Sequence, residues 1–132
     1  MPFEEIAHTA DWSLRVWAGN LETLFAEAGR GLYALAGARP AEGRRSRRRF
    51  EAAAPDPEAL LVAFLSELVY ALEQEGTIYE NFQIEIEANR LRVEMDGAPL
   101  EAVNKIIKAV TYHNLQIRCS ERGCEVEIVF DV

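Results

Sequence analysis

Carboxylates near opposite ends of the sequence are the groups best suited to do chemistry, as ligands of a metal ion. Asp131 is the next-to-last residue, so its side chain lies beside the α-carboxylate of Val132. Carboxyl groups of both kinds are ordinarily anionic at neutral pH, and hard cations such as Mg²⁺, Mn²⁺ and Ca²⁺ prefer oxygen ligands of this type. Asp11, expected at the edge of a strand, can supply a third carboxylate. The alternative is that these carboxylates are simply solvated.

The histidines His8 and His113 are the only ones in the sequence that could serve as the base for a nucleophile. No serine or cysteine stands in a convincing context for either of them. The sequence also lacks a phosphate-binding glycine loop, a dinucleotide-binding fingerprint and a nucleophile elbow. We therefore expect a protein that is not itself an enzyme. His8 lies in a polar loop beside Asp11 and is free to act, whereas His113 is expected to be an inward-facing, hydrogen-bonded residue opposite Phe130.

The charge balance limits the partners of the chain. A net charge of −8, from 22 acidic and 14 basic residues, disfavours autonomous binding to nucleic acid or to an anionic membrane. Residues 44–49, RRSRRR, are a local exception. This run has two interpretations, a patch for RNA or an acidic partner and a solvated edge strand in which charge blocks edge-to-edge pairing. We favour the edge strand.

Cys119 and Cys124 are the only cysteines, too few for a disulfide scaffold or for a four-ligand zinc site within one chain. They face each other across a predicted hairpin. Free thiols are the default expectation for a cytosolic protein. A facultative disulfide and a metal ion shared between chains are the alternatives.

The elements that must position these residues include two helices, which are indicated by their ends. Asn20 is a favourable N-cap for the first helix, and Gly37 ends it. Asp56 caps the second helix, Pro57 occupies its first position and Gly76 ends it. An apolar stripe follows one face of each helix, as is typical of helices packed on a core.

The other segments alternate apolar and polar residues, which is typical of strands. Residues 3–7, residues 12–17 and the arginine run leading into Phe50 are predicted strands. Two hairpins follow, with the expected cross-strand partners Ile86–Leu91, Ile84–Val93 and Phe82–Met95 in the first, and Cys119–Cys124, Ile117–Val126, Leu115–Ile128 and His113–Phe130 in the second. Residues 101–110 fit a short helix or a strand.

These elements predict a single domain over residues 1–132, of the α+β class. Two helices would pack on a mostly antiparallel or mixed sheet and form a two-layer sandwich. A chain of 132 residues of which 49% are apolar is long enough to bury a core. No apolar stretch approaches the ~20 residues of a membrane span, and the N-terminus lacks the features of a signal peptide, so we expect a cytoplasmic protein.

Three motifs occur in a fixed order along the chain. They are His8-Thr9-Ala10-Asp11 near the start, KAVTYH at residues 108–113, and Val129-Phe130-Asp131-Val132 at the end. Together they resemble the archease family, and length, acidity and element order match it over essentially the whole chain. Archeases are protein cofactors of the RtcB-type tRNA-splicing ligase, and they promote transfer of GMP from GTP onto the active-site histidine of that ligase.

The resemblance implies a non-catalytic activator of an RtcB-type ligase, which meets GTP and tRNA only through the ligase. It implies that Asp11, Asp131 and the carboxylate of Val132 hold a divalent metal ion, Ca²⁺, Mg²⁺ or Mn²⁺. Many members carry a further acidic residue after the first helix, where residues 37–40 here read GARP, so that ligand is either lost or supplied by Glu42 or water.

Further contacts with the partner or with a phosphate are assigned by the same resemblance. The residues concerned are His8, Lys108 and His113.

Two other classes of function compete with this one. A chaperone or specificity factor for another RNA enzyme, such as a tRNA methyltransferase, is a role also suggested for the family, and it needs a docking surface but no metal ion. A metal-dependent hydrolase or nuclease would use the same carboxylates and show turnover without any partner.

Overall fold

The computed structural model describes residues 2–7 and 11–132. In chain order the elements are β1 (Phe3–Ala7), β2 (Asp11–Ala18), α1 (Leu21–Ala36), β3 (Arg39–Pro40), β4 (Ser46–Ala53), α2 (Pro57–Tyr70), the π-helical turn η1 (Ala71–Glu75), β5 (Thr77–Glu87), β6 (Arg90–Ala102), β7 (Ala109–Val110), β8 (Arg118–Ser120) and β9 (Gly123–Asp131). Within these described residues, no helix is long and apolar enough to cross a membrane.

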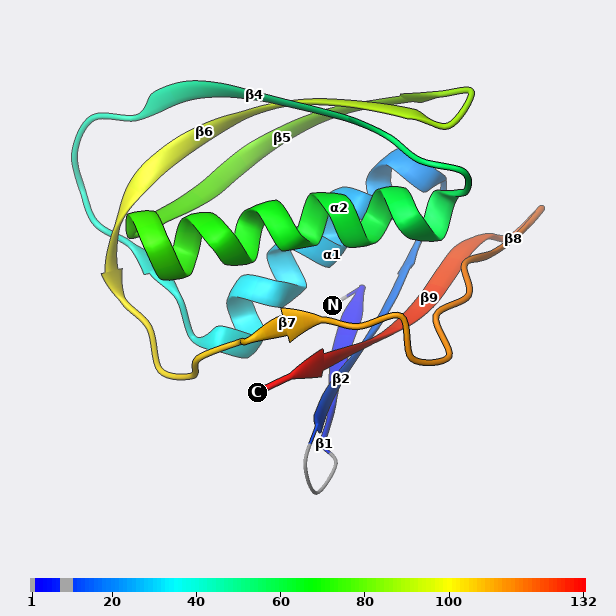
Figure 1. The fold of residues 1–132 in the computed structure, drawn as a ribbon, viewed down its shortest axis with the longest axis horizontal. Helices are drawn as coiled ribbons and strands as arrows, with labels where there is room; N and C mark the ends of the chain where they lie inside the picture. The colour runs from blue at the N-terminus through cyan, green and yellow to red at the C-terminus, as the bar shows by residue number, and fades with distance from the viewer. Residues whose placement is uncertain (1, 8–10) are drawn as a thin grey trace.

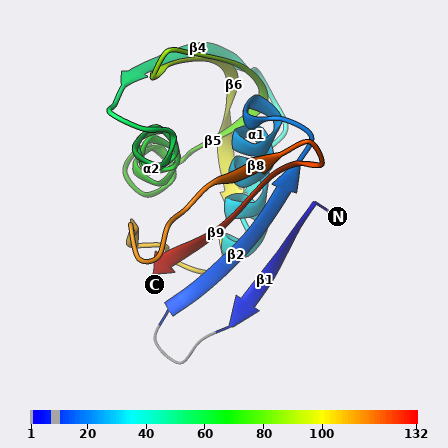
Figure 2. The same ribbon diagram turned by 90° about the vertical axis from the view of Figure 1, so that its right-hand side faces the viewer.

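The described strands form two sheets, and all of their pairings are antiparallel. The first sheet has the order β1-β2-β9-β7, with β8 also paired to β9, and the second has the order β3-β6-β4, with β5 also paired to β6. α1 contacts both sheets, while α2 contacts α1, β4 and β7. The helices therefore lie between the sheets (Figure 1), as is also seen when α2 is viewed end-on (Figure 2). The predicted α+β class is confirmed, with the strands divided between two sheets.

Both helices begin and end close to where the sequence predicts. The Asn20 and Asp56 side chains each accept a hydrogen bond of 2.8 Å from the backbone N–H three residues later. Gly37 ends α1 with a left-handed φ of 65°, a conformation that glycine adopts without steric cost. α2 runs into η1, which the sequence does not predict, before Gly76 ends the helical segment.

α1 packs closely on the first sheet through Gly31. A Cβ atom added there would lie 2.5 Å from Leu14 Cδ2 in β2. Leu14 is fully buried, and so are Val16 beside it and Ile128 opposite it in β9. This packing fixes the inner face of the β2–β9 ladder.

The β5–β6 hairpin keeps most of its predicted register. Two of the three expected pairs form, Ile86–Leu91 and Ile84–Val93. The third, Phe82–Met95, falls where the register shifts between Glu80 and Gln83, so it is not part of the ladder. Asn81 has a φ of 56° within this bulge.

In the last hairpin, only the pairing next to the turn is as predicted. Cys119 pairs with Cys124, but the ladder between β8 and β9 extends only to Arg118 and Glu125. The other predicted pairs, Ile117–Val126, Leu115–Ile128 and His113–Phe130, are wrong, because residues 111–117 leave the sheet. The backbone N–H of Ile117 donates instead to Glu58 Oε2 of α2, at 2.8 Å.

The position opposite Phe130 is taken by Val110 of β7. His113 is therefore exposed, and its predicted place as an inward-facing core residue is wrong. A turn produces this change: the Leu115 N–H donates to the Tyr112 carbonyl at 3.1 Å, and Asn114 between them has a φ of 52°. Residues 103–108, which precede β7, are neither helix nor strand.

Candidate functional site

The β2–β9 ladder brings Asp11 and Asp131 together, although they are far apart in the sequence. The two residues are directly opposite each other at the end of the ladder. Opposite residues in an antiparallel pair have Cβ atoms about 4.5–5.5 Å apart, on the same face of the sheet. Because side chains alternate along a strand and Leu14 and Ile128 face the core, the two aspartates project from the other face. We call this pair the carboxylate corner.

β7 holds the other side of Asp131. Ala109 is opposite Asp131 in the β7–β9 ladder, and the backbone N–H of Lys108 donates to the Asp131 carbonyl at 2.8 Å. Asp131 therefore lies between two strands, which fixes its backbone while its side chain remains exposed. Val132, which follows it, is half-buried and packs against the core.

The other residues predicted to contact the partner or a phosphate are less directly connected to the carboxylate corner. Lys108 is exposed and adjoins the carboxylate corner through its backbone. His113 lies in the exposed turn after β7, with its backbone N–H 3.3 Å from Thr111 Oγ1. His8 falls outside the described residues.

Sequence reasoning missed Lys105, a basic residue that packs near this end of the ladder. Its Nζ lies 2.8 Å from the centroid of the Trp12 ring, a cation–π contact. Trp12 follows Asp11 in the chain and is opposite Phe130 in the ladder. The charged end of Lys105 therefore lies over an aromatic ring. In the described part of the chain, neither Asp11 nor Asp131 forms an ion pair. The only signal for Lys105 was its nearness to Lys108, in a segment of ambiguous structure.

The donor set of the carboxylate corner fits a hard divalent cation. Two carboxylates on adjacent strands supply oxygen ligands of the kind that Ca²⁺, Mg²⁺ and Mn²⁺ prefer. Ser13, on the same face of β2 as Asp11, has a fully buried hydroxyl without a hydrogen-bond partner among the described residues. Within residues 2–7 and 11–132, no three or more His, Cys, Asp and Glu side chains lie together so that they could hold a metal ion. The carboxylate of Val132 and water would therefore have to complete the coordination.

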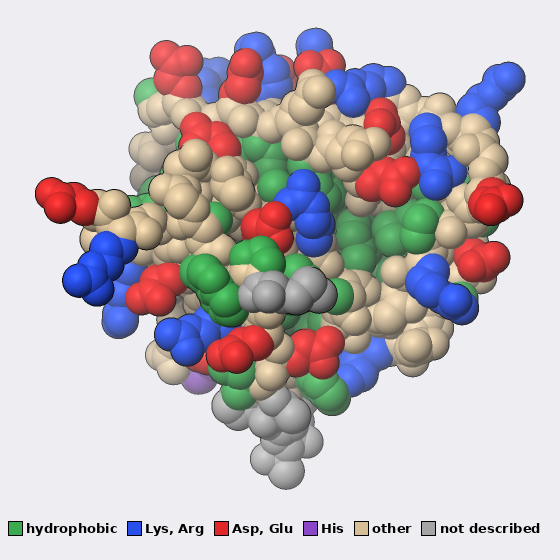
Figure 3. Space-filling model, turned by 180° about the vertical axis from the view of Figure 1, so that it is seen from behind, with side chains coloured by type: hydrophobic (Ala, Val, Ile, Leu, Met, Phe, Trp, Pro, Cys, Tyr) green, Lys and Arg blue, Asp and Glu red, His purple; other side chains and the backbone are tan. Residues whose placement is uncertain are grey.

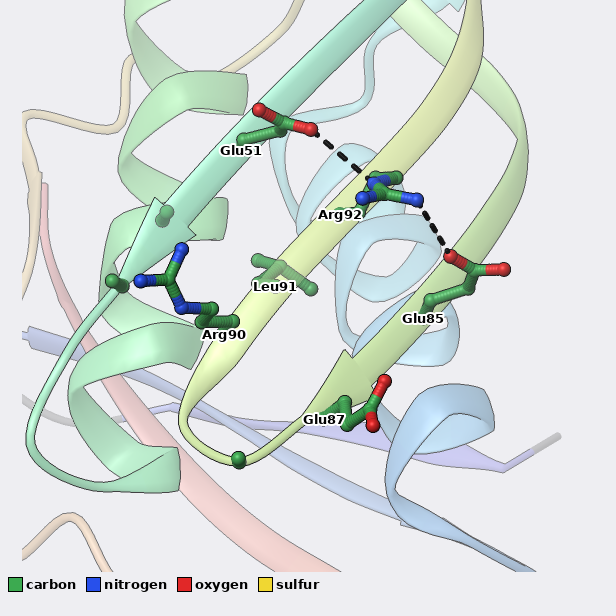
Figure 4. A pocket seen from close by; sticks show the side chains of 9 residues that line it. Glu51, Glu85, Glu87, Arg90, Leu91 and Arg92 are labelled. Carbon is green, nitrogen blue, oxygen red and sulfur yellow. Dashed lines mark hydrogen bonds and ion pairs between the residues drawn. The ribbon is translucent and has the colours of Figure 1, made fainter.

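A second group of acidic side chains lines a pocket of about 600 Å³ on the outer face of the second sheet (Figure 4). Here Arg92 lies between Glu51 and Glu85, with nitrogen–oxygen distances of 3.2 Å and 3.4 Å. Further along the same face Arg47 and Asp96 are 3.2 Å apart. Glu51 and Glu85, which line this pocket, are therefore already neutralised by Arg92.

The arginine run forms the start of β4 and the residues before it. β4 pairs only with β6 among the described strands, so it is an edge strand, as predicted. Arg45 pairs with Glu80, and Arg47 pairs with Asp96 and Glu94. Acidic and basic side chains are also interspersed over the face of the molecule seen in Figure 3. This supports the solvated edge strand over a nucleic-acid patch.

Cys119 and Cys124 form a disulfide, with a Cα–Cα distance of 4.0 Å. The expectation of free thiols is therefore wrong in this structure, and the disulfide alternative is correct. The bond joins opposite residues of the β8–β9 ladder, at the end of β9 remote in sequence from Asp131.

The chain matches the family model described as "Archease protein family (MTH1598/TM1083)" over residues 3–132. It is 31% identical to Protein archease of Methanopyrus kandleri, over 100% of both chains. It is 28% identical to Protein archease of Methanosarcina barkeri, over 98% of this chain and 95% of the other.

Two solved structures share the fold. Protein 1598 of Methanobacterium thermoautotrophicum superposes with a TM-score of 0.72 at 19% identity, over 99% of each chain. A Thermotoga maritima protein described as an archease and possible chaperone has a TM-score of 0.72 at 22% identity, over 98% of this chain and 96% of the other. At these identities the likeness concerns the fold alone.

Proposed function

The chain belongs to the archease family, and on this basis we propose that it is a cytoplasmic accessory protein that activates an RtcB-type RNA ligase in tRNA splicing. It acts by promoting the metal-dependent guanylylation and the turnover of the ligase, and it is not an enzyme itself. The observation that supports this proposal most directly is the placement of Asp11 opposite Asp131 at the end of the β2–β9 ladder.

The ligands would be Asp11, Asp131 and the carboxylate of Val132. A divalent cation bound there would neutralise charge on the phosphates of GTP, which favours phosphoryl and nucleotidyl transfer. The protein holds the carboxylates in place by the antiparallel pairing of β2 and β7 on either side of β9. The nucleophile and the binding sites for GTP and tRNA belong to the ligase.

The test is guanylylation of the RtcB-type ligase of the same organism, with GTP and Mn²⁺, in the presence and absence of this protein. Wild type should stimulate the reaction, and Asp131→Ala should not. Asp131 is exposed, so this variant should unfold at the same denaturant concentration as wild type. Glu85→Ala, which removes an exposed acid of the second sheet, is the matched control and should stimulate as wild type does. Full stimulation by Asp131→Ala would exclude the metal mechanism.

A second function is favoured by the exposed apolar side chains of the molecule. Tyr70 and Ile106 are each more than half exposed and line one groove, and exposed apolar groups gathered in one place are suited to binding another protein. A chaperone or specificity factor for a tRNA-modifying enzyme would use such a surface without a metal ion. Stimulation of the partner that persists in excess chelator would favour this function over the first.

A further inference from the structure

A groove of about 470 Å³ runs between α2 and the segment that contains β7. One wall is formed by α2 and η1, and the other by residues 106–110. Tyr70 and Ile106, one from each wall, are 56% and 63% exposed and lie in the same groove. Two such side chains on opposite walls mark the groove as an interaction surface.

The backbone around the groove is also suited to binding a peptide segment. β7 is paired only with β9 in the described part of the chain, and α2 contacts it as well (Figure 1). An edge strand has unpaired backbone groups, to which an extended segment of another protein can add as a further strand. η1 supplies Glu73 and Gln74 to the opposite wall, and π-helical turns occur frequently at functional sites.

The groove is continuous with the carboxylate corner. Lys108 lines the groove, and its backbone N–H donates to the Asp131 carbonyl at 2.8 Å. A partner bound in the groove would therefore lie next to Asp131. No similar connection links the corner to the pocket on the second sheet, which is lined by β4, β5 and β6.

Charge identifies the kind of occupant. The chain carries a net charge of −8, so a second copy of it is repelled and a basic protein is attracted. Enzymes that hold RNA and nucleotides are basic around their active sites, because they must bind phosphates. Glu73 and Lys108 both line the groove, so its own charges balance, and the preference for a basic partner comes from the negative net charge of the chain. Tyr70 and Ile106 need an apolar partner.

From these observations we infer that the groove between α2 and β7 binds an extended apolar segment, flanked by basic residues, of the partner enzyme. The groove supplies affinity, while the carboxylate corner beside it supplies activation. This inference rests on the proposed function for the identity of the partner enzyme.

The affinity of the ligase for fluorescently labelled protein tests the inference, measured by anisotropy with excess EDTA so that no metal ion contributes. Tyr70→Ser and Ile106→Ser should each raise the Kd about tenfold or more, as expected for apolar side chains central to an interface. Tyr112→Ser and Val103→Ser are matched controls, because these side chains are 61% and 37% exposed and lie outside the groove. Both controls should bind within about twofold of wild type.

Guanylylation assays then separate the groove from the carboxylate corner. At saturating concentration, Tyr70→Ser should reach the stimulation of wild type, whereas Asp131→Ala should bind as wild type does and not stimulate. Wild-type affinity of both groove variants would overturn the inference and leave the proposed function intact. Loss of affinity in the groove variants together with full stimulation by Asp131→Ala would support the inference and exclude the metal mechanism of the proposed function.

Two further outcomes would also overturn the inference. Failure of wild type to bind the ligase would remove both the inference and the proposed function. A dimer of the isolated protein that Ile106→Ser abolishes, detected by analytical ultracentrifugation, would assign the groove to a second copy of the chain.

Discussion

Two groups of acidic side chains on this molecule differ in what faces them. On the second sheet Arg92 lies between Glu51 and Glu85, and Arg47 lies against Asp96. At the end of the first sheet, no described basic side chain forms an ion pair with Asp11 or Asp131. Glu51, Glu85 and Arg92 of the first group line a pocket, and the two aspartates of the second lie at the end of a ladder.

The difference bears on which group of carboxylates could accept a cation. A carboxylate that is already paired with an arginine gains little from a metal ion, because the metal must displace that arginine. Two carboxylates on opposite residues of adjacent strands repel each other, and a bound cation turns this repulsion into attraction. For this reason the cation site is proposed at the carboxylate corner and not at the pocket on the second sheet.

The largest expected effect comes from neutralising both acids of one group. Asp11→Asn/Asp131→Asn should lower the affinity for Mn²⁺ about hundredfold, because charged ligands set the affinity of hard cations. Glu51→Gln/Glu85→Gln removes the same two negative charges from the other group and should change the affinity less than about twofold. Isothermal titration calorimetry with MnCl₂ measures both. An equal loss in the two variants would mean that only overall charge matters.

Lys105 offers a sharper test, because it packs on Trp12, the residue that follows Asp11 in the chain. Its charge lies over the Trp12 ring, so Lys105→Met should cost about 1 kcal/mol of folding free energy through loss of the cation–π contact. The Mn²⁺ affinity should change by less than about threefold. Lys108→Met, for which the structure records no such ring contact, should stay within about 0.5 kcal/mol of wild type in urea denaturation. A large gain in Mn²⁺ affinity in Lys105→Met would show that Lys105 neutralises the aspartates after all.

The local parts of this fold were predictable from the sequence. Asn20, Gly37 and Asp56 mark the helix ends by interactions within a few residues. The β5–β6 hairpin is also local, since the turn at Ala88-Asn89 sets the register of the pairs nearest to it. The bulge at Asn81 was not predictable, because the apolar alternation begins only at Phe82 and so gives no register for the residues before it.

The predicted register of the second hairpin is wrong because of a local turn at residues 112–115 and a contact with α2. His113, Leu115 and Ile117 alternate as in a strand, yet a hydrogen bond from Ile117 to Glu58 of α2 holds this segment away from β9. The site itself depends on equally distant contacts. The chemistry of Asp11 and Asp131 was visible in the sequence, but the β2–β9 pairing that places them opposite each other joins the two ends of the chain. No local pattern encodes that pairing.

A smaller effect is expected from substitution of Arg92, the residue that pairs with Glu51 and Glu85 in the second-sheet group. Its side chain is 58% exposed, and exposed ion pairs contribute little because of solvent screening and side-chain entropy. Arg92→Met should therefore lower the free energy of unfolding by less than about 1 kcal/mol. Because salt screens surface charges, the difference should shrink further in 1 M NaCl, at a Debye length of about 3 Å. Stimulation of the ligase should be unaffected, and its loss would move the functional site to the second sheet.

The smallest effect concerns pH. The Asn81 amide and the Arg47 guanidinium hold the pKa of Asp96 below its usual value. A carboxylate with a lowered pKa in the folded state stabilises the fold above its unfolded pKa of about 4, and this contribution is lost as the pH falls through the folded pKa. Asp96→Asn should thus unfold at a lower urea concentration than wild type at pH 7, and the difference should shrink as the pH falls below the unfolded pKa. Asp11→Asn removes no ion pair among the described residues, so it should not be destabilised at pH 7. If Asp11→Asn lost as much stability as Asp96→Asn, Asp11 would have a stabilising partner of its own, and the distinction between the two groups of acids would fail.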